Sequence, residues 1–201
     1  MERCLSAIAA NTGDWPYEII IEDDPPERPT GLPLTLERAV TRSAGEYVVF
    51  LGNDCLPQPG WLRAAMECMS FFPERVGLVA LNDRQFDGEQ FAINWVASKA
   101  LLPLLGGQFY CPEYKHVGCD VELSARCKQI GRYKWCQQAR IIHEHGPTHQ
   151  KWLTWEERMS DTLLLLMRAV QFGFVDFLPT YRDYLPVGQT FPSQPASHSA
   201  G

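Results

Sequence analysis

The sequence predicts an α/β domain in which helices flank a mostly parallel sheet. Three short runs rich in β-branched and aromatic residues, 17–22, 47–51 and 76–81, are separated by segments with helical periodicity. Strands that alternate with helices in this way are typical of layered α/β domains. The run 47–51 is almost continuously apolar, as expected of a strand that is covered on both faces in a parallel sheet. We expect one domain over residues 1–178 and a Pro/Ser-rich C-terminal tail over 179–201.

The helices expected in the first half of the chain are 2–10, 34–43 and 60–72. Each of them carries apolar residues at helical spacing. The turn-forming sequence Asn11-Thr-Gly-Asp14 ends the first helix, and the proline-containing segment 25–33 predicts a loop before the second.

The second half of the chain is less regular at first. Residues 82–117 are rich in glycine and aromatic residues and predict loops. A helix over 120–130 follows, with Gly131 as its expected C-terminal cap. A strand over 139–143 then leads into the turn Glu144-His-Gly-Pro147.

The last predicted helix has the clearest start and stop. Thr154-x-x-Glu157 is a capping box, and Gly173 is placed to end the helix. An apolar stripe runs along the helix at i, i+3 and i+4 spacing, which predicts a face packed on the core. Docking of this stripe on a membrane surface or a partner helix is the alternative. The residues of the stripe are Trp155, Met159, Leu163, Leu166 and Val170.

Composition and charge exclude several classes of protein. The net charge is −6 and there is no run of five basic residues, so we expect no nucleic-acid partner. The N-terminus lacks the pattern of a signal peptide, and the apolar run 163–170 is too short for a transmembrane segment. The seven cysteines include no C-x-x-C pair, which indicates reduced thiols in a cytoplasmic protein rather than disulfides or a zinc knuckle.

Acidic residues follow two of the predicted strands. Glu22-Asp23-Asp24 comes directly after 17–22, and Asn53-Asp54 comes shortly after 47–51. In open α/β sheets, ligands bind beyond the carboxyl ends of the strands. Carboxylates gathered there favour a hard divalent cation, Mg²⁺ or Mn²⁺, which could bridge a diphosphate. The alternative is that Asp24-Pro25 and Asn53-Asp54 are ordinary turn residues.

Two further groups of residues have both a chemical and a structural interpretation. Asp120 is a candidate general base, or it is the N-cap acceptor of the helix that begins there. Glu122 and Arg126, four residues apart, predict an ion pair on the helix surface. His143 and His145 lie on one face at a strand end, where they either bind a metal or pack as ordinary histidines.

The order of these segments resembles the family 2 glycosyltransferases of the GT-A fold. Tyr17-Glu-Ile-Ile-Ile-Glu-Asp-Asp24 is similar to the second strand of that family with its terminal acidic pair. Gly45-Glu-Tyr-Val-Val-Phe-Leu-Gly-Asn-Asp54 is similar to the strand that leads into the D-x-D motif. Gly118-Cys-Asp-Val-Glu-Leu-Ser-Ala-Arg126 is similar to the E-D-x-x-L-x-x-R segment, and Ile141-Ile-His143 to a late strand whose histidine can coordinate the metal.

The resemblance implies an inverting transferase that moves a sugar from a UDP-, GDP- or dTDP-linked donor to a glycan, lipid-linked or protein acceptor. It implies Asp54 and His143 as ligands of Mn²⁺ or Mg²⁺, and Asp120 as the base on the acceptor hydroxyl. Asp23 and Asp24 would line the nucleoside pocket, and Asn53 would support the metal loop.

The chain departs from the family pattern at three places. Gly52 stands at the first acid of D-x-D, Cys119 replaces the acid before the base, and the first strand of the family is missing, so we expect an N-terminally truncated GT-A-like domain. These departures leave a non-catalytic nucleotide- or glycan-binding relic as an alternative. A metal-dependent hydrolase built on His143, His145 and His149 is another.

Overall fold

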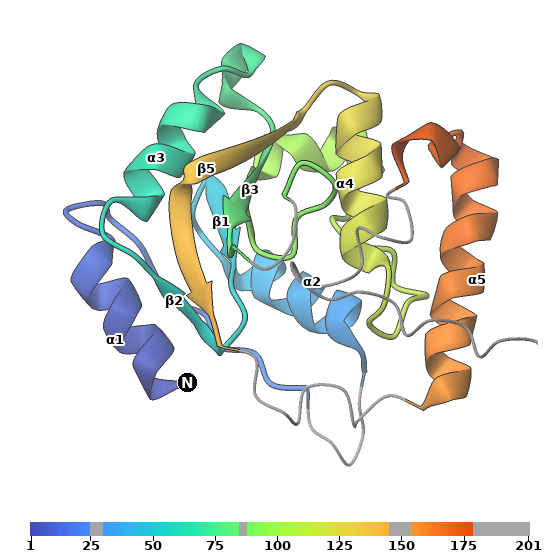
Figure 1. Cartoon of the computed structure of the whole chain (residues 1–201), viewed down its shortest axis with the longest axis horizontal. Helices are drawn as coiled ribbons and strands as arrows, with labels where there is room; N and C mark the ends of the chain where they lie inside the picture. Colours follow the sequence, from blue (N-terminus) through green and yellow to red (C-terminus); the bar gives the residue numbers. More distant parts are fainter. Residues whose placement is uncertain (25–29, 85–87, 145–153, 179–201) are drawn as a thin grey trace, which may run out of the picture.

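The computed structural model of the chain describes residues 1–24, 30–84, 88–144 and 154–178 (Figure 1). Within these residues a five-stranded sheet in the order β1-β4-β3-β5-β2 lies between helices. The strands are β1 (Tyr47–Phe50), β2 (Cys55–Pro57), β3 (Leu78–Asn82), β4 (Trp95–Ser98) and β5 (Tyr133–His143). The helices are α1 (Glu2–Asn11), α2 (Leu32–Arg42), α3 (Trp61–Met69), α4 (Cys119–Gln129) and α5 (Trp155–Phe172), with short 3₁₀ turns at Pro73–Arg75, Lys99–Leu105 and Val175–Phe177.

The sheet is mixed, so the expectation of a mostly parallel sheet is wrong. Only the β3–β5 pair is parallel among the described strands, whereas β1–β4, β3–β4 and β2–β5 are antiparallel. The antiparallel pairing in the centre of the sheet arises from β4, which lies in the segment 82–117 that we expected to be irregular. All four residues of β4 are buried, and no helix crosses between β3 and β4 in the described residues. Strands without such a crossover connection pair antiparallel.

The strand predicted at 17–22 is also wrong. This segment runs on without a ladder to any described strand, and the side chains of Tyr17, Ile19 and Ile21 are each almost half exposed. It is held by its two carboxylates: Glu18 accepts hydrogen bonds from the backbone N–H groups of Ala44 and Gly45, and Glu22 pairs with Arg38 and Arg42 of α2. Strand β1 has a described partner, β4, on one side only. The β-branched run was suited to a strand, but a strand forms only where a second backbone pairs with it.

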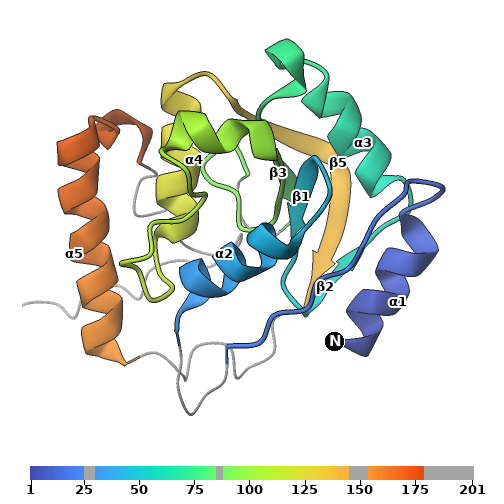
Figure 2. The same cartoon turned by 180° about the vertical axis from the view of Figure 1, so that it is seen from behind.

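The core is divided by the sheet into two layers. Successive residues of β3 point to opposite faces, as the pleat requires. Leu78 and Ala80 pack in the cluster that includes residues of α2 and α4, whereas Val79 and Leu81 pack in the cluster that includes residues of α3. Figures 1 and 2 show the corresponding arrangement, with α3 on one side of the sheet and α2 and α4 on the other.

The predicted helices are confirmed, but the prediction for the apolar stripe of α5 is wrong. The capping box at Thr154 and Glu157 is formed, and Gly173 ends the helix with φ at 72°. The residues that α5 buries are Asp161, Leu165 and Ala169, so the predicted stripe points away from the core. None of the described helices has the length and hydropathy that a membrane span requires. The predicted tail lies outside the described residues.

Candidate functional site

The candidate site lies where three strands end. Asp54 occupies the turn between β1 and β2, Cys55 begins β2, and His143 is the last residue of β5. The β2–β5 register pairs Cys55 directly with His143. Asp83 follows the last residue of β3. The parallel strands β3 and β5 therefore deliver Asp83 and His143 to one edge of the sheet, where the β1–β2 turn brings Asp54.

The His143 ring lies between two carboxylates. Its Nε2 is 3.4 Å from Oδ1 of Asp54, and its Nδ1 is 3.4 Å from Oδ2 of Asp83. The side chains of these residues are largely buried, with exposures of 8%, 15% and 5% for His143, Asp54 and Asp83. One ligand atom each of Asp54, Cys55 and His143 lie within 4.8 Å of one another. Among the described residues, this is the group whose ligand atoms lie close enough together to hold a metal ion.

Electrostatics couple the members of this cluster. Burial alone lowers the pKa of His143, but hydrogen bonds to Asp54, Asp83 and Cys55 outweigh burial and raise the pKa to about 11. Burial raises the pKa of the Cys55 thiol, so the thiol stays protonated at neutral pH and is a poor metal ligand. Without a bound metal ion, the imidazolium of His143 lies between the two carboxylates and compensates part of their negative charge.

The donor set fits a divalent cation. One carboxylate, from Asp54, and the Nε2 atom of His143 offer an oxygen and a nitrogen ligand on one side of the ring, and the neutral thiol of Cys55 adds little; Asp83 lies at Nδ1 on the other side. Carboxylates suit Mg²⁺ and Mn²⁺, and an imidazole ligand favours Mn²⁺ of the two. A cation at this position would take the place of the proton between Nε2 of His143 and the Asp54 carboxylate.

The loop that carries Asp54 is held by Asn94. The Oδ1 atom of this buried amide accepts hydrogen bonds from the Gly52 N–H at 3.0 Å and from the Cys55 thiol at 3.3 Å. Asn94 precedes β4, so the antiparallel strand fixes the position of the loop. The sequence reasoning missed Asn94, because nothing in the local pattern around it indicates such a contact. It also missed Asp83, although Asn82-Asp83 follows a buried strand much as Asn53-Asp54 does.

Asp120 is not the N-cap of its helix. The N-cap of α4 is Gly118 at φ 83°, and Asp120 lies one residue inside the helix start, where its Oδ1 accepts the Val121 N–H at 2.9 Å. The N-cap interpretation of Asp120 is therefore wrong. Burial of its carboxyl group raises its pKa from 3.8 to about 6, against the opposing effect of the Val121 N–H. A carboxylate with a pKa near neutrality has the strength that a general base needs.

The surface ion pair expected on α4 is a buried network instead. Glu122 is 1% exposed and accepts two hydrogen bonds from the Arg168 guanidinium at 2.7 and 2.8 Å. The Tyr114 hydroxyl donates a third at 2.8 Å, and Arg126 lies 3.5 Å away. Glu122 therefore ties α4 to α5 and is not available to a substrate.

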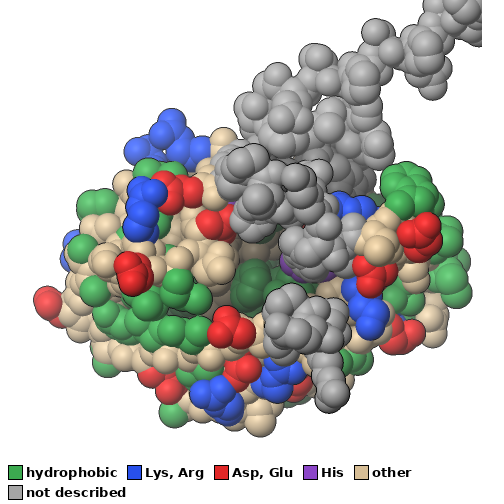
Figure 3. Space-filling view, turned by 90° about the horizontal axis from the view of Figure 1, so that it is seen from below, with side chains coloured by type: hydrophobic (Ala, Val, Ile, Leu, Met, Phe, Trp, Pro, Cys, Tyr) green, Lys and Arg blue, Asp and Glu red, His purple; other side chains and the backbone are tan. Residues whose placement is uncertain are grey.

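Asp120 and the cluster lie at the same end of the domain. Figures 1 and 2 show that α4 begins at the end of the molecule where β5 finishes. Burial raises the pKa of the Tyr110 phenol, and the nearby Asp120 carboxyl group adds to this; the Tyr110 hydroxyl accepts a hydrogen bond from Trp95. Trp95 stacks on Phe50, the last residue of β1. Seen from this end, the surface has a hollow lined by hydrophobic side chains, with a histidine beside it (Figure 3).

The other predicted site residues have less defined positions. The Asp24 carboxylate accepts hydrogen bonds from the N–H groups of Thr30 and Gly31 and from the Thr30 hydroxyl, so it closes the loop before α2. Asp23 and Asn53 are exposed, and their roles stay predictions. His145 and His149 lie outside the described residues.

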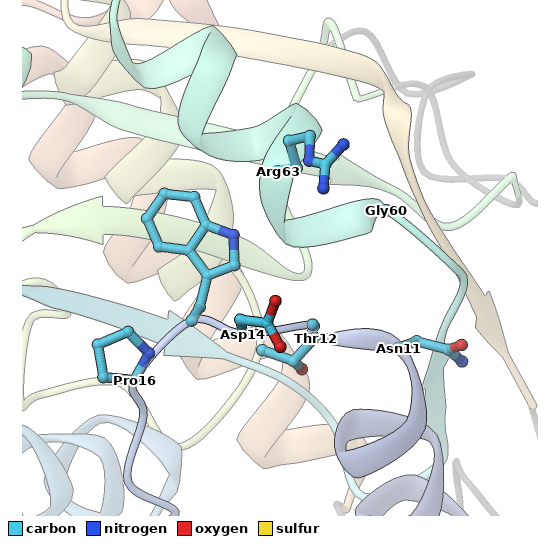
Figure 4. Close-up of a pocket in the computed structure, with 8 residues that line it drawn as sticks. Asn11, Thr12, Asp14, Pro16, Gly60 and Arg63 are labelled. Atoms are coloured by element: carbon cyan, nitrogen blue, oxygen red, sulfur yellow. The ribbon is translucent and has the colours of Figure 1, made fainter.

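A cavity of about 300 Å³ lies away from the cluster and is built by different elements. It lies between the turn that follows α1 and the start of α3, and Figure 4 shows Arg63 across from Asp14. None of its lining residues belongs to the cluster or to α4.

No family model matches this chain, and no curated protein matches it. A functional assignment therefore rests on the residues and their geometry.

Proposed function

We propose that the protein is a metal-assisted, inverting glycosyltransferase with a GT-A-like arrangement. The contact of Asp54 with His143 at the carboxyl ends of the strands is the observation that carries the proposal. The acidic cluster suits a cation that binds a sugar-nucleotide diphosphate, and Asp120 supplies a base at the same end of the domain. The order of the sequence segments supports the same assignment.

In this mechanism Asp54 and Nε2 of His143 would hold Mn²⁺ or Mg²⁺. The cation would neutralise the diphosphate of a nucleotide-sugar and so stabilise it as a leaving group. Asp83 also orients the His143 ring through Nδ1, which leaves Nε2 directed to the side of Asp54. Asp23 and Asp24 would line the nucleoside pocket, and Asn53 would support the metal loop.

Asp120 takes the proton of the acceptor hydroxyl as that oxygen attacks the anomeric carbon. The bond between this carbon and the diphosphate oxygen breaks at the same time, and the nucleoside diphosphate leaves on the opposite face. The configuration at the anomeric carbon inverts. The burial that raises the pKa of Asp120 to about 6 strengthens it as a base while it remains ionised at neutral pH.

Donor turnover tests the proposal. UDP-, GDP- and dTDP-sugars are offered with Mn²⁺ to the wild-type chain, and release of the nucleoside diphosphate is followed with and without glycan acceptors. We expect release with at least one donor, and a loss of 100-fold or more in Asp120→Asn with donor binding unchanged. Transfer by Asp120→Asn at the wild-type rate would rule out the base assignment.

A second candidate function is a non-catalytic nucleotide- or glycan-binding relic. Segment 17–22 pairs with no described strand, and β1 has a described partner on one side only; both favour it, because the resemblance implies strands there as part of the donor pocket. Calorimetry that detects binding of UDP or GDP without turnover of any donor selects this alternative.

A further inference from the structure

Exposed apolar side chains form a continuous stripe along α5. The helix turns by about 100° per residue, so these residues fall within roughly one third of its circumference. Their exposures run from 38% at Met159 to 75% at Val170. The members of this α5 stripe are Trp155, Met159, Leu163, Leu166, Met167 and Val170. Figures 1 and 2 show α5 at the outer edge of the molecule, beyond α4.

Polar contacts on the inner face of α5 prevent the helix from rotating the stripe inward. The Asp161 carboxylate accepts hydrogen bonds from three consecutive backbone N–H groups, 115–117, at 2.8–2.9 Å. Arg168 makes its two hydrogen bonds to buried Glu122 on the same side. Rotation would break both sets of contacts and leave charges buried without partners, which is costly. The exposure of the stripe is thus built into the packing of α5.

The charge pattern on α5 indicates what covers the stripe. Every exposed residue from Met159 to Val175 is uncharged, because Asp161 is buried and Arg168 is bound to Glu122. Helices that lie on membranes carry Lys and Arg on their polar side. Here the exposed charges that border the stripe, Glu156 and Asp176, are acidic, and the one basic residue beside it, Arg158, is only partly exposed. This pattern disfavours an anionic lipid surface and favours an apolar protein surface.

We propose that the α5 stripe is the interface of a homodimer in which two α5 helices pack antiparallel. The exposed parts of its six side chains amount to about 600–700 Å², close to the ~800 Å² per partner of a standard interface. This area also exceeds the largest apolar patch of a typical monomer, which is about 300–600 Å². A patch that matches itself across a two-fold axis needs no second gene product.

The antiparallel arrangement follows from the residues at the two ends of the stripe. A two-fold axis near 162–163 places Trp155 against Val170 of the second copy and Met159 against Leu166, with the two Leu163 side chains close to the axis. The largest side chain then meets the smallest of the stripe. A parallel pair would set two Trp155 side chains and two acidic first turns against each other, which costs packing and electrostatic energy.

Sedimentation velocity over roughly 1–100 µM chain tests the proposal, because interfaces of this size dissociate in that range or below. We expect the wild type to be dimeric and Leu163→Glu to dissociate at least 100-fold more readily. Leu104→Glu is the matched control, since Leu104 is 54% exposed and Leu163 is 55% exposed. It should leave the dimer unchanged. An equimolar mixture of Leu163→Glu and Leu163→Lys should restore a heterodimer, because the two positions meet at the axis.

Four results would overturn the inference. They are a wild type that stays monomeric throughout, equal dissociation by Leu104→Glu, no heterodimer from the charge-reversed mixture, and a monomer that instead sediments with phosphatidylcholine vesicles. If circular dichroism shows that Leu163→Glu is unfolded, Val170→Glu replaces it and must dissociate the dimer to the same extent. Its side chain is 75% exposed, so the substitution does not enter the core.

Discussion

The raised pKa of Asp120 predicts a pH dependence of stability that one substitution removes. The pKa of this carboxyl group is about 6 in the folded chain and 3.8 without the fold. The folded state therefore binds the proton more tightly than the unfolded state. The contribution of Asp120 to stability is therefore highest below about pH 4, falls as the pH rises from about 4 to about 6, and is constant above that. Asp120→Asn keeps the shape of the side chain and abolishes the titration.

The magnitude follows from the size of the shift. A shift of about two pH units corresponds to about 3 kcal/mol between the protonation states. The residue is half-buried, so solvent screens part of this energy, and we expect about 1–2 kcal/mol. Asp120→Asn should thus be about 1–2 kcal/mol more stable than the wild type at pH 7 and equally stable near pH 4.

Urea unfolding at several pH values between about 4 and 8 measures the difference. Asp176→Asn is the control, because Asp176 is exposed and should give curves parallel to the wild type. If Asp120→Asn also runs parallel to the wild type at every pH, or is the less stable chain at pH 7, the carboxyl group is not desolvated. The assignment of Asp120 as a strengthened base would then lose its physical basis.

Two further predictions concern buried charge and the cation. Arg168→Met removes the closer guanidinium of the buried Glu122 carboxylate and leaves only Arg126 at 3.5 Å, so urea unfolding should show a loss of stability of about 3–5 kcal/mol, largely recovered when Glu122→Gln is added. If the double variant regains none of the lost stability, Arg168 acts through packing alone. Asp54→Asn and His143→Ala each remove one ligand, and electron paramagnetic resonance of free Mn²⁺ should show affinity reduced at least tenfold. Undiminished Mn²⁺ binding in both variants would exclude the cluster as the metal site.

Local patterns predicted the helices well, because their information is local. The capping box at Thr154 and the stop at Gly173 are formed by residues within one helical turn. The apolar stripe on α5 was recognised, but its burial was not predictable. Which side of a helix faces inward depended on Asp161 finding three distant N–H groups and on Arg168 finding Glu122.

Strand direction and pairing were harder to predict than helices, because they depend on residues that lie far apart in the sequence. The segment 17–22 has a suitable pattern but no described partner, and β4 was hidden in a stretch rich in glycine and aromatic residues. In the site, the sequence suggested Asp54 and His143, which the fold brings within 3.4 Å. Asp83 follows a strand by the same rule and was overlooked, whereas Asn94 acts through a contact 42 residues away that no local pattern reveals.

Anomalous diffraction from a crystal grown with Mn²⁺ and UDP tests the central claim most directly. The account predicts one manganese peak within bonding distance of Asp54 and His143, with diphosphate oxygens on its open side and the Asp120 carboxylate facing the same hollow. A manganese ion bound elsewhere, or a nucleotide that occupies a different face of the domain, would contradict it.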